Sequence, residues 1–418
     1  MELKRVVVTG IGAVSPLGND MPTTWAAMLA GKSGCGPITH FDASLFKTQF
    51  ACEVKDFDPS SIIDKKEARR LDLFVQYALC AASEAMNDAA LEIDNEDKYR
   101  IGCVWATGMG GLRSFQECIE EYMSGDGTPR FNPFVIPKLI TNIAAGHISI
   151  KYGLGGPNYA TTSACASSAH AIADSFNLIR LGKADAILTG GSEASIEYSG
   201  VGGFNAMHAL STRNDSPESA SRPFSKSRDG FVLGEGAAAL VLEEYEHAVK
   251  RGAKIYAELA GAAMTADAYH ITAPDPDGNG ALKVMQFAIE EAGLQPADID
   301  YINAHGTSTP IGDVAEIKSI CALFGEHAFN LNISSTKSMT GHLLGATGAL
   351  EAIATLLAVK ENIVPPTINH AEDDTDEQFD PRLNFTFNKA QRRKVDYAIS
   401  NAFGFGGHNA CLLFKKLN

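Results

Sequence analysis

Several features that would indicate a membrane, secreted or metal-binding protein are missing from this chain of 418 residues. No run of about 18 apolar residues is free of charged residues or glycine, so we expect no membrane-spanning helix. The first residues run directly into Val6-Val7-Val8, without the long apolar region and small-residue cleavage site of a secretory signal. The eight cysteines stand singly, with no CxxC pair and no zinc-like spacing. These absences favour a cytoplasmic protein with free thiols and no metal site.

Positive charge is also scarce. The chain has 35 Lys and Arg against 50 Asp and Glu, a formal net charge of −15, which argues against binding to nucleic acid or to an anionic membrane. The segment from Lys65 to Arg70 is an exception, because it holds four basic residues. Such a cluster is commonly a solvated helix face, and its functional alternative is a docking surface for an acidic partner.

The regular pattern of the chain is a short apolar run, a glycine-rich turn and then a helix. The expected strands include 6–10, 101–105, 186–190, 238–242, 301–303 and 397–400, and a long helix is expected from Ala346 to Lys360. This alternation predicts a layered α/β fold. A Ser/Thr-rich turn before an Ala-rich helix occurs near residue 161 and again near residue 334. This faint echo predicts two similar halves, residues 1–252 and 253–418.

A partial nucleotide-binding motif occurs near the N-terminus. Gly10 and Gly12 form a GxG after the first expected strand, but Ser15 stands where the third glycine would be and Pro16 follows. A GxG without its third glycine is weak evidence, so we expect no dinucleotide site here.

Cys165 is the cysteine whose surroundings suggest chemistry. Ser and Thr residues precede it and an Ala-rich stretch follows, which predicts that it lies in the first turn of a helix. The positive end of the helix dipole would lower its thiol pKa below the usual value of about 8.5. The alternative is a buried core cysteine, which is the commoner role and the one we assign to the other seven.

Two histidines stand beside glycine in turns. His305 comes directly after a strand, where α/β folds place ligands, and His342 lies between Gly341 and Gly345 ahead of the long helix. Each alone would fit a hydrogen-bonded structural side chain. Together with a cysteine at a helix start they suggest nucleophilic thiol chemistry. Lys337, five residues before His342, is either a cation of this site, a partner of a carboxylate such as Glu351, or a surface lysine.

Four motifs in order make the sequence similar to a known family. They are the segment around Cys165, Asn303 to Thr309, Lys337 with Gly341-His342, and Asn401 to Gly407. On these residues the chain resembles the β-ketoacyl-acyl carrier protein synthases of fatty acid synthesis, most closely the synthase II branch, over nearly its whole length. The resemblance implies a thiolase-like fold, in which two βαβαβαββ halves form five α-β-α-β-α layers, and a homodimer.

The resemblance also implies a reaction. Cys165 would accept an acyl chain as a thioester, and malonyl-acyl carrier protein would then lose carbon dioxide and attack it. His305 and His342 would hydrogen-bond the malonyl thioester carbonyl, and the backbone N–H groups of Cys165 and Phe405 would form a second oxyanion hole. No cofactor beyond the 4'-phosphopantetheine of acyl carrier protein is implied.

Further roles follow from the same resemblance. Lys337 and Glu351 would form an ion pair near the histidines, and Lys337 would belong to the catalytic set. The substrate-binding residues would be Met109, Phe204, Thr307, Thr309 and Phe405, with Phe405 as a gate. The carrier protein would dock on Lys66, Arg69 and Arg70. His208 and His408 depart from the family pattern, which commonly has Arg and Thr there.

Four other kinds of protein share parts of this pattern. A thiolase would need a second catalytic cysteine in the Gly404–Gly407 motif, which has none. A polyketide ketosynthase shares the Cys-His-His set and stays open, although the absence of fused carrier or acyltransferase segments favours fatty acid synthesis. A Cys-His thioester hydrolase would leave the second histidine without a role. A non-catalytic chain-length subunit would lack the cysteine nucleophile.

Overall fold

The computed structural model describes residues 3–417. Ten of its strands form one continuous sheet, which divides into two five-stranded halves, here called the N-terminal and C-terminal sheets, that are joined where β1 pairs with β8. The N-terminal sheet contains β1 (Val6–Val14), β4 (Ile101–Ala106), β5 (Asn158–Thr161), β6 (Ala186–Glu193) and β7 (Gly236–Glu244). The C-terminal sheet contains β8 (Ala257–Ala266), β9 (Tyr301–Asn303), β10 (Asn332–Ser334), β13 (Tyr397–Gly404) and β14 (His408–Lys415). Only three residues of β1 and β8 pair across the junction.

The two sheets have the same topology. The spatial order is β5-β4-β6-β7-β1 in the first and β10-β9-β13-β14-β8 in the second, so the strands of each half occur in the order 3-2-4-5-1. In the N-terminal sheet β5, β4 and β6 run parallel, and in the C-terminal sheet β10, β9 and β13 do. The other two strands of each sheet, β7 and β1 or β14 and β8, pair antiparallel with their neighbours. The faint repeat in the sequence therefore corresponds to a duplicated βαβαβαββ unit. The second set of strands begins at Ala257, close to the expected boundary at residue 252.

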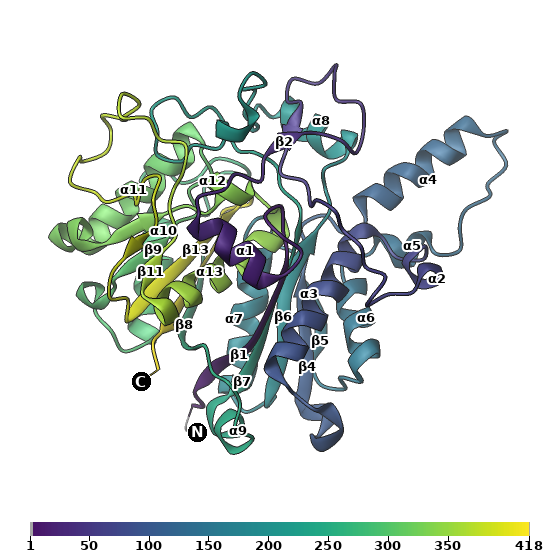
Figure 1. The fold of residues 1–418 in the computed structure, drawn as a ribbon, viewed down its shortest axis with the longest axis horizontal. Coiled ribbons are helices and arrows are strands. Elements are labelled where there is room, and N and C mark those ends of the chain that lie inside the picture. Colours follow the sequence, from purple (N-terminus) through teal and green to yellow (C-terminus); the bar gives the residue numbers. More distant parts are fainter. Residues whose placement is uncertain (1–2, 418) are drawn as a thin grey trace.

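Helices cover both faces of each sheet and complete the five layers (Figure 1). The middle layer consists of α7 (Ser167–Arg180) and α13 (Thr347–Glu361), which pack against each other and against strands of both sheets. One outer layer contains α3 (Leu73–Ala89) and α6 (Ile143–Tyr152), and the other contains α10 (Asn279–Glu291) and α11 (Pro310–Phe324). This arrangement confirms the predicted thiolase-like α/β fold.

Burial of the strands on both faces explains why their sequences are apolar throughout and do not alternate between apolar and polar residues. In β7, Ala238, Leu240 and Leu242 belong to the central core between the sheets, whereas Ala237, Ala239 and Val241 belong to the outer core beneath α3. Successive side chains point to opposite faces of a strand, so a strand covered on both sides must be apolar throughout.

The glycines of the partial GxG motif serve this packing. A Cβ atom at Gly10 or Gly12 would lie 2.2 Å from the carbonyl oxygen of Ala85 or Ala81 in α3. Only glycine allows the helix to approach the strand this closely. The motif is therefore a packing feature of β1, in keeping with its rejection as a nucleotide site.

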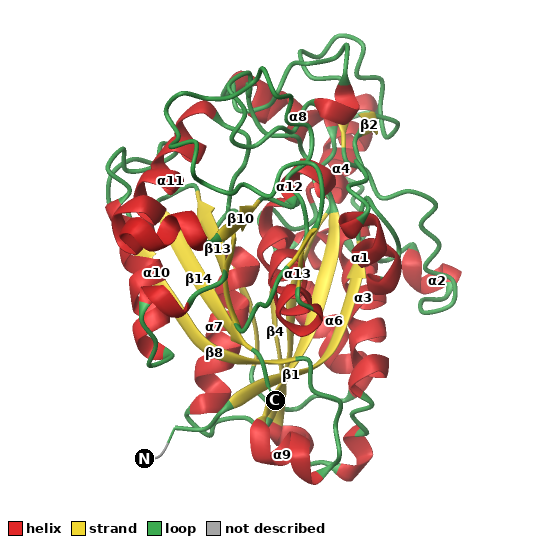
Figure 2. Ribbon diagram, turned by 60° about the vertical axis from the view of Figure 1, so that its left-hand side comes forward, coloured by secondary structure: helices red, strands yellow, loops and turns green. Residues whose placement is uncertain are grey.

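Loops and short helices gather beyond one end of the sheets, and both termini lie toward the other (Figure 2). The elements not named above are α1 (Met21–Leu29), α2 (Lys65–Ala68), α4 (Leu112–Ser124), α5 (Val135–Leu139), α8 (Tyr198–Ala206), α9 (Tyr245–Lys250), α12 (Lys337–Thr340), β2 (Gly36–Pro37), β3 (Phe50–Ala51), β11 (Ile363–Val364) and β12 (Gln391–Arg392). Of these, α9 lies at the end of the molecule that holds the termini (Figure 2). No helix within residues 3–417 is long and apolar enough to cross a membrane.

Candidate active site

Cys165 lies in the turn between β5 and α7. The helix begins at Ser167, so the cysteine stands two residues before it and not in its first turn as predicted. The side chain of Ser167 holds this turn, because its hydroxyl donates to the Ala164 carbonyl and accepts from the Ser163 N–H. Ala164 has a φ of +51°, which bends the chain so that the cysteine side chain turns inward. Only 8% of Cys165 is exposed.

The predicted lowering of the Cys165 pKa is wrong. Burial raises the pKa of this thiol to about 11, although the positive charge of Lys337 and the backbone N–H groups of Phe405 and Cys165 itself lower it. Loss of water around the sulfur therefore outweighs the favourable charges. At neutral pH the thiol keeps its proton until a substrate arrives.

The backbone around Gly404 reaches the same sulfur from the other half of the chain. A Cβ at Gly404 would lie 3.1 Å from the Cys165 nitrogen, so the end of β13 packs directly on the cysteine turn. The backbone N–H of Phe405 lowers the pKa of the thiol, as the N–H of Cys165 does. Two backbone donors, from Cys165 and Phe405, thus act on the same sulfur from different halves of the chain.

His305 and His342 face each other in the loops that follow β9 and α12. Their ring centroids are 5.5 Å apart and the ring planes are nearly perpendicular. Nδ1 of His342 is 2.9 Å from the Thr347 hydroxyl. Nε2 of His342 and Nδ1 of His305 are buried without a hydrogen-bond partner in the described part of the chain. Unpaired buried nitrogens are costly, which is the pattern expected where a substrate completes the hydrogen bonds.

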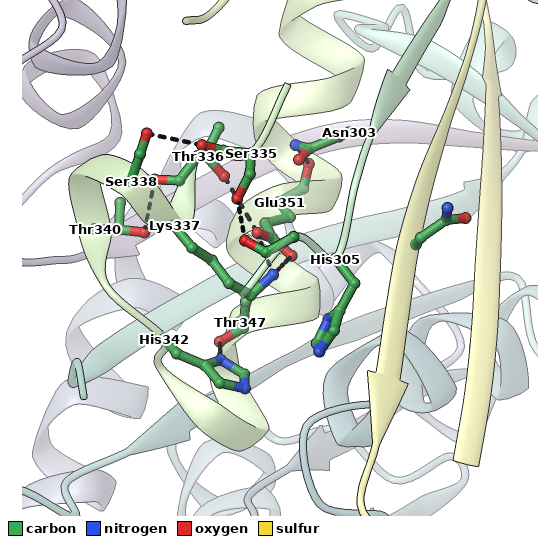
Figure 3. A network of polar contacts seen from close by, with 12 residues as sticks. Asn303, His305, Ser335, Thr336, Lys337, Ser338, Thr340, His342, Thr347 and Glu351 are labelled. Atoms are coloured by element: carbon green, nitrogen blue, oxygen red, sulfur yellow. Dashed lines mark hydrogen bonds and ion pairs between the residues drawn. The ribbon is translucent and has the colours of Figure 1, made fainter. Parts of the chain in front are cut away.

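A buried ion pair lies behind the two histidines (Figure 3). Nζ of Lys337 is 2.7 and 2.8 Å from the two carboxylate oxygens of Glu351 in α13, and only 1% of the lysine is exposed. Burial and the charge of Lys337 hold the pKa of both histidines well below the usual value of 6.5, and His342 lowers that of His305 further. Both imidazoles are therefore neutral at pH 7.

The neutral state of these rings is open to direct measurement. In imidazole ¹⁵N NMR spectra we expect His305 and His342 to remain neutral from pH 8 down to below pH 6, because a lowered pKa means that protonation begins only at more acidic pH. The same side chains in urea should titrate near 6.5. Protonation of both rings near pH 6.5 in the folded protein would contradict this account.

Two buried carboxylates of α11 were not anticipated from the sequence. Glu316 accepts the backbone N–H groups of His305 and Gly306, each at 2.8 Å, and the Asn401 amide at 3.1 Å. Asp313 accepts the N–H of Ser308 at 3.1 Å. Both side chains are buried and together hold the loop that carries His305. Acidic residues in an otherwise apolar helix are the one sequence signal that could have revealed them.

A cavity of about 470 Å³ opens onto Cys165, His305 and His342. Its wall also includes four residues expected to bind substrate, Phe204, Thr307, Thr309 and Phe405, and the divergent His208. Met109 is not in this wall but packs with Cys165 and Phe204 in an adjoining apolar cluster. The predicted site residues from both halves thus meet at the carboxyl ends of β5, β9 and β13.

The remaining predicted residues lie elsewhere. Lys66, Arg69 and Arg70 are exposed on and just after α2, with the Arg70 guanidinium over the Phe134 ring. Helix α2, which carries the start of this basic segment, lies on the opposite side of the chain from α10 and α11 (Figure 1). His408 is exposed, and its ring is 6.3 Å from that of His170. No metal-binding group of His, Cys, Asp and Glu occurs within residues 3–417.

Comparison with known proteins gives consistent matches over the full length. Residues 3–248 match the beta-ketoacyl synthase N-terminal domain and residues 256–371 match its C-terminal domain. The chain is 50% identical over 418 residues to 3-oxoacyl-(acyl-carrier-protein) synthase 2 of Synechocystis sp., covering 100% of this chain and 99% of the relative. Identity to the enzyme of the same name from Coxiella burnetii is 49% over 417 residues, covering 100% of each.

Solved structures agree with these matches. A beta-ketoacyl synthase from Burkholderia phymatum superposes with a TM-score of 0.91 at 36% identity, covering 99% of this chain and 100% of that one. The AntDE:AntF complex, described as a type II PKS acyl-carrier protein with its ketosynthase bound to the hexaketide, gives a TM-score of 0.90 at 34% identity with complete coverage of both chains.

Proposed function

Because this chain belongs to the beta-ketoacyl synthase family, we propose that the cavity at Cys165 is where it elongates fatty acids by decarboxylative condensation. The enzyme is an acyltransferase that joins a Cys-bound acyl chain to malonyl-acyl carrier protein and forms 3-oxoacyl-acyl carrier protein. The observation that carries the assignment of roles is that one thiol and two neutral imidazoles with unpaired nitrogens share one cavity.

Acyl transfer to the enzyme is the first step. The Cys165 sulfur attacks the thioester carbonyl of acyl-acyl carrier protein, and the carbon–sulfur bond to pantetheine breaks as the new one forms. The thiol proton passes to the departing pantetheine sulfur. The N–H groups of Cys165 and Phe405 stabilise the oxyanion of the tetrahedral intermediate. This stabilisation offsets the high pKa of the thiol, because the negative charge develops on an oxygen that these two groups can hydrogen-bond.

Decarboxylation and condensation follow. Each imidazole donates one hydrogen bond to the malonyl thioester oxygen, and the bond to carbon dioxide breaks as negative charge moves onto that oxygen. If the Thr347 hydroxyl donates to Nδ1 of His342, the ring proton is on Nε2, the buried nitrogen that has no partner among the described residues. The resulting carbanion attacks the Cys165 thioester, and the cysteine sulfur leaves and regains a proton.

Lys337 does not line the cavity. Burial is the main reason that the pKa of both histidines is low, and the Lys337 charge lowers it further, while the bond to Glu351 keeps that charge in place. Thr307 and Thr309 do line the cavity, and their hydroxyls are 3.0 Å apart. They are suited to bind the amide groups of the pantetheine arm. Phe405 is suited to gate the cavity, and Met109 with Phe204 to contact the acyl chain.

The alternatives lack support at particular residues. Cys411, the cysteine nearest in sequence to the Gly404–Gly407 motif, is buried in the outer core of the C-terminal sheet and cannot serve as the second thiol of a thiolase mechanism. A hydrolase would leave the second unpaired imidazole without a role. The ketosynthase described as part of a type II PKS is 34% identical to this chain, below the 50% and 49% of the 3-oxoacyl-(acyl-carrier-protein) synthases.

The acyl carrier protein is proposed to dock on Lys66, Arg69 and Arg70. These side chains are exposed, and a local basic surface on a chain of net charge −15 attracts an acidic partner without favouring nucleic acid. The substrates would arrive on the 4'-phosphopantetheine of that carrier, and the reaction needs no other cofactor. All eight cysteines are free thiols, which is compatible with the cytoplasm.

A homodimer is proposed from two uncovered surfaces of the N-terminal half. β5 is an edge strand of its sheet, and Asn158 and Tyr159 on it are exposed. α4 projects from the body of the chain (Figure 1) with Phe115, Ile119 and Met123 exposed. Unpaired strand edges and contiguous apolar surface are the features that a partner chain usually covers.

Changing the apolar face of α4 should separate the dimer. We expect wild type to sediment at twice the mass of one chain, and the Phe115→Glu, Ile119→Glu variant to sediment as a monomer. Burying two carboxylates per chain would cost more free energy than the apolar contact contributes to dimer formation. Lys283→Glu on α10, in the opposite outer layer, serves as a control. A dimeric double variant would place the interface elsewhere.

Incubation with malonyl-acyl carrier protein and acyl-acyl carrier protein carrying a radiolabelled acyl chain tests the function. The expected product is labelled 3-oxoacyl-acyl carrier protein, two carbons longer than the primer. Release of labelled free acid without condensation would instead establish a hydrolase.

A further inference from the structure

Glu193, at the end of β6, is a buried carboxylate that the reaction steps above do not use. Its residue is 0% exposed, and its two oxygens accept hydrogen bonds from five donors. Burial raises its pKa, while bonds from Gly108, Ser195, Gly345 and Met109 lower it. A carboxylate surrounded by donors in this way is built to hold backbone in place.

The three backbone donors come from two loops in different halves of the chain. Gly108 and Met109 follow β4, and Gly345 follows His342. The loops touch each other, because a Cβ on Gly345 would lie 2.2 Å from the Gly108 nitrogen. Between His342 and Gly345 stands Leu344, which has a φ of +46° and lines the cavity. Met109 and Leu344 both belong to the apolar cluster around Cys165.

We propose that Glu193 is a positioning residue that determines acyl-chain selectivity by fixing the Met109 loop against the Leu344 loop beside Cys165. The proposal rests on the proposed function. Met109 and Leu344 would form part of the wall that meets the acyl chain, and their separation depends on one carboxylate that both loops share.

The two oxygens of Glu193 have different partners, which allows a selective test. Oε2 accepts the backbone N–H groups of Gly108 at 2.7 Å and Gly345 at 3.0 Å. Oε1 accepts the Met109 N–H at 3.2 Å and the hydroxyls of Ser195 and Thr107 at 2.9 and 3.4 Å. Hydroxyls can rotate and accept a hydrogen bond, whereas a backbone N–H cannot.

Glu193→Gln should therefore loosen only the Met109 loop. The amide oxygen would take the Oε2 position and keep Gly108 and Gly345, while the amide NH₂ would face Met109 N–H and leave it unpaired. We expect the wild-type preference among short, medium and long acyl chains, measured as initial rates of Cys165 acylation, to shrink by roughly tenfold. Malonyl-acyl carrier protein decarboxylation, which depends on the histidines, should stay within about twofold of wild type.

Two further variants make the outcome decisive. Glu197→Gln changes a nearby buried carboxylate that bonds Gln116 and neither loop, and it should leave acyl preference unchanged. Ser195→Ala removes one donor to Oε1 and should shift acyl preference in the same direction as Glu193→Gln, but by less. It therefore still tests the proposal if the Glu193→Gln variant does not fold. An unchanged preference in both, or an equal fall in acylation of all lengths and in decarboxylation, would overturn the proposal. A wild type that neither acylates nor decarboxylates would instead overturn the proposed function.

Discussion

Cys165→Ala will abolish 3-oxoacyl product while the protein still releases carbon dioxide from malonyl-acyl carrier protein. The substitution removes the one thiol among the residues that line the cavity, so no acyl-enzyme can form, and we expect condensation to fall by roughly 10⁴-fold or more. Decarboxylation relies on His305, His342 and their unpaired nitrogens, which the substitution leaves in place. Its rate should stay within about tenfold of wild type.

The measurement is a paired assay on one preparation. Radiolabelled acyl-acyl carrier protein reports transfer of the acyl chain to the protein, and release of labelled carbon dioxide reports decarboxylation. Cys103→Ala is the matched control, because Cys103 is a fully buried thiol in β4 that faces the outer core and should be dispensable. Acyl label on the Cys165→Ala protein, or normal condensation by it, would show that another group is the nucleophile.

Breaking the Lys337–Glu351 pair should cause the largest loss of stability. Both side chains are almost fully buried, so Glu351→Ala leaves the lysine charge without its partner, and we expect the free energy of unfolding to fall by about 3–5 kcal/mol. Lys337→Met should cost a similar amount for the converse reason. The double variant Lys337→Met, Glu351→Leu removes both charges and should recover most of the stability.

The double variant should nevertheless have altered catalysis. The Lys337 charge lowers the pKa of both histidines, so its removal raises those values. Because the neutral rings are the active form, the acid limb of the decarboxylation profile should move to higher pH. Urea unfolding and the pH profile measure the two effects separately. Arg382→Met, which breaks the exposed Arg382–Asp380 pair, is the control and should change neither. Single variants as stable as wild type would show that the pair is not structural.

Much of the fold could be predicted because its central strands are apolar on both faces. The runs at β1, β4, β6, β7, β9 and β13 were all expected, as was α13, although most of the strands extend several residues further than predicted. β5, β8, β10 and β14 were not predicted. β5 is partly exposed at a sheet edge, and β10 has only three residues, so neither contains a sustained apolar run.

The pKa of Cys165 shows where local reasoning failed. The residues around it correctly indicated a turn before a helix, and that local feature alone predicted an activated thiolate. The thiol pKa is instead raised, because loops from the other half of the chain, including Gly404 and Phe405, bury the cysteine. Desolvation of this kind depends on what covers a residue, and neighbours in sequence do not reveal it.

The sequence by itself determined the layered α/β class and the family, and its motifs predicted Cys165, His305, His342 and Lys337 as site residues. Glu351 was predicted only as a partner of Lys337. Only the tertiary structure decided that both imidazoles are neutral, that the thiol is protonated, and that Glu316 and Glu193 hold the loops of the site. Those properties arise from distances and burial between segments that are far apart in the chain. Electrostatic and hydrogen-bond energies depend on such distances and not on the order of residues.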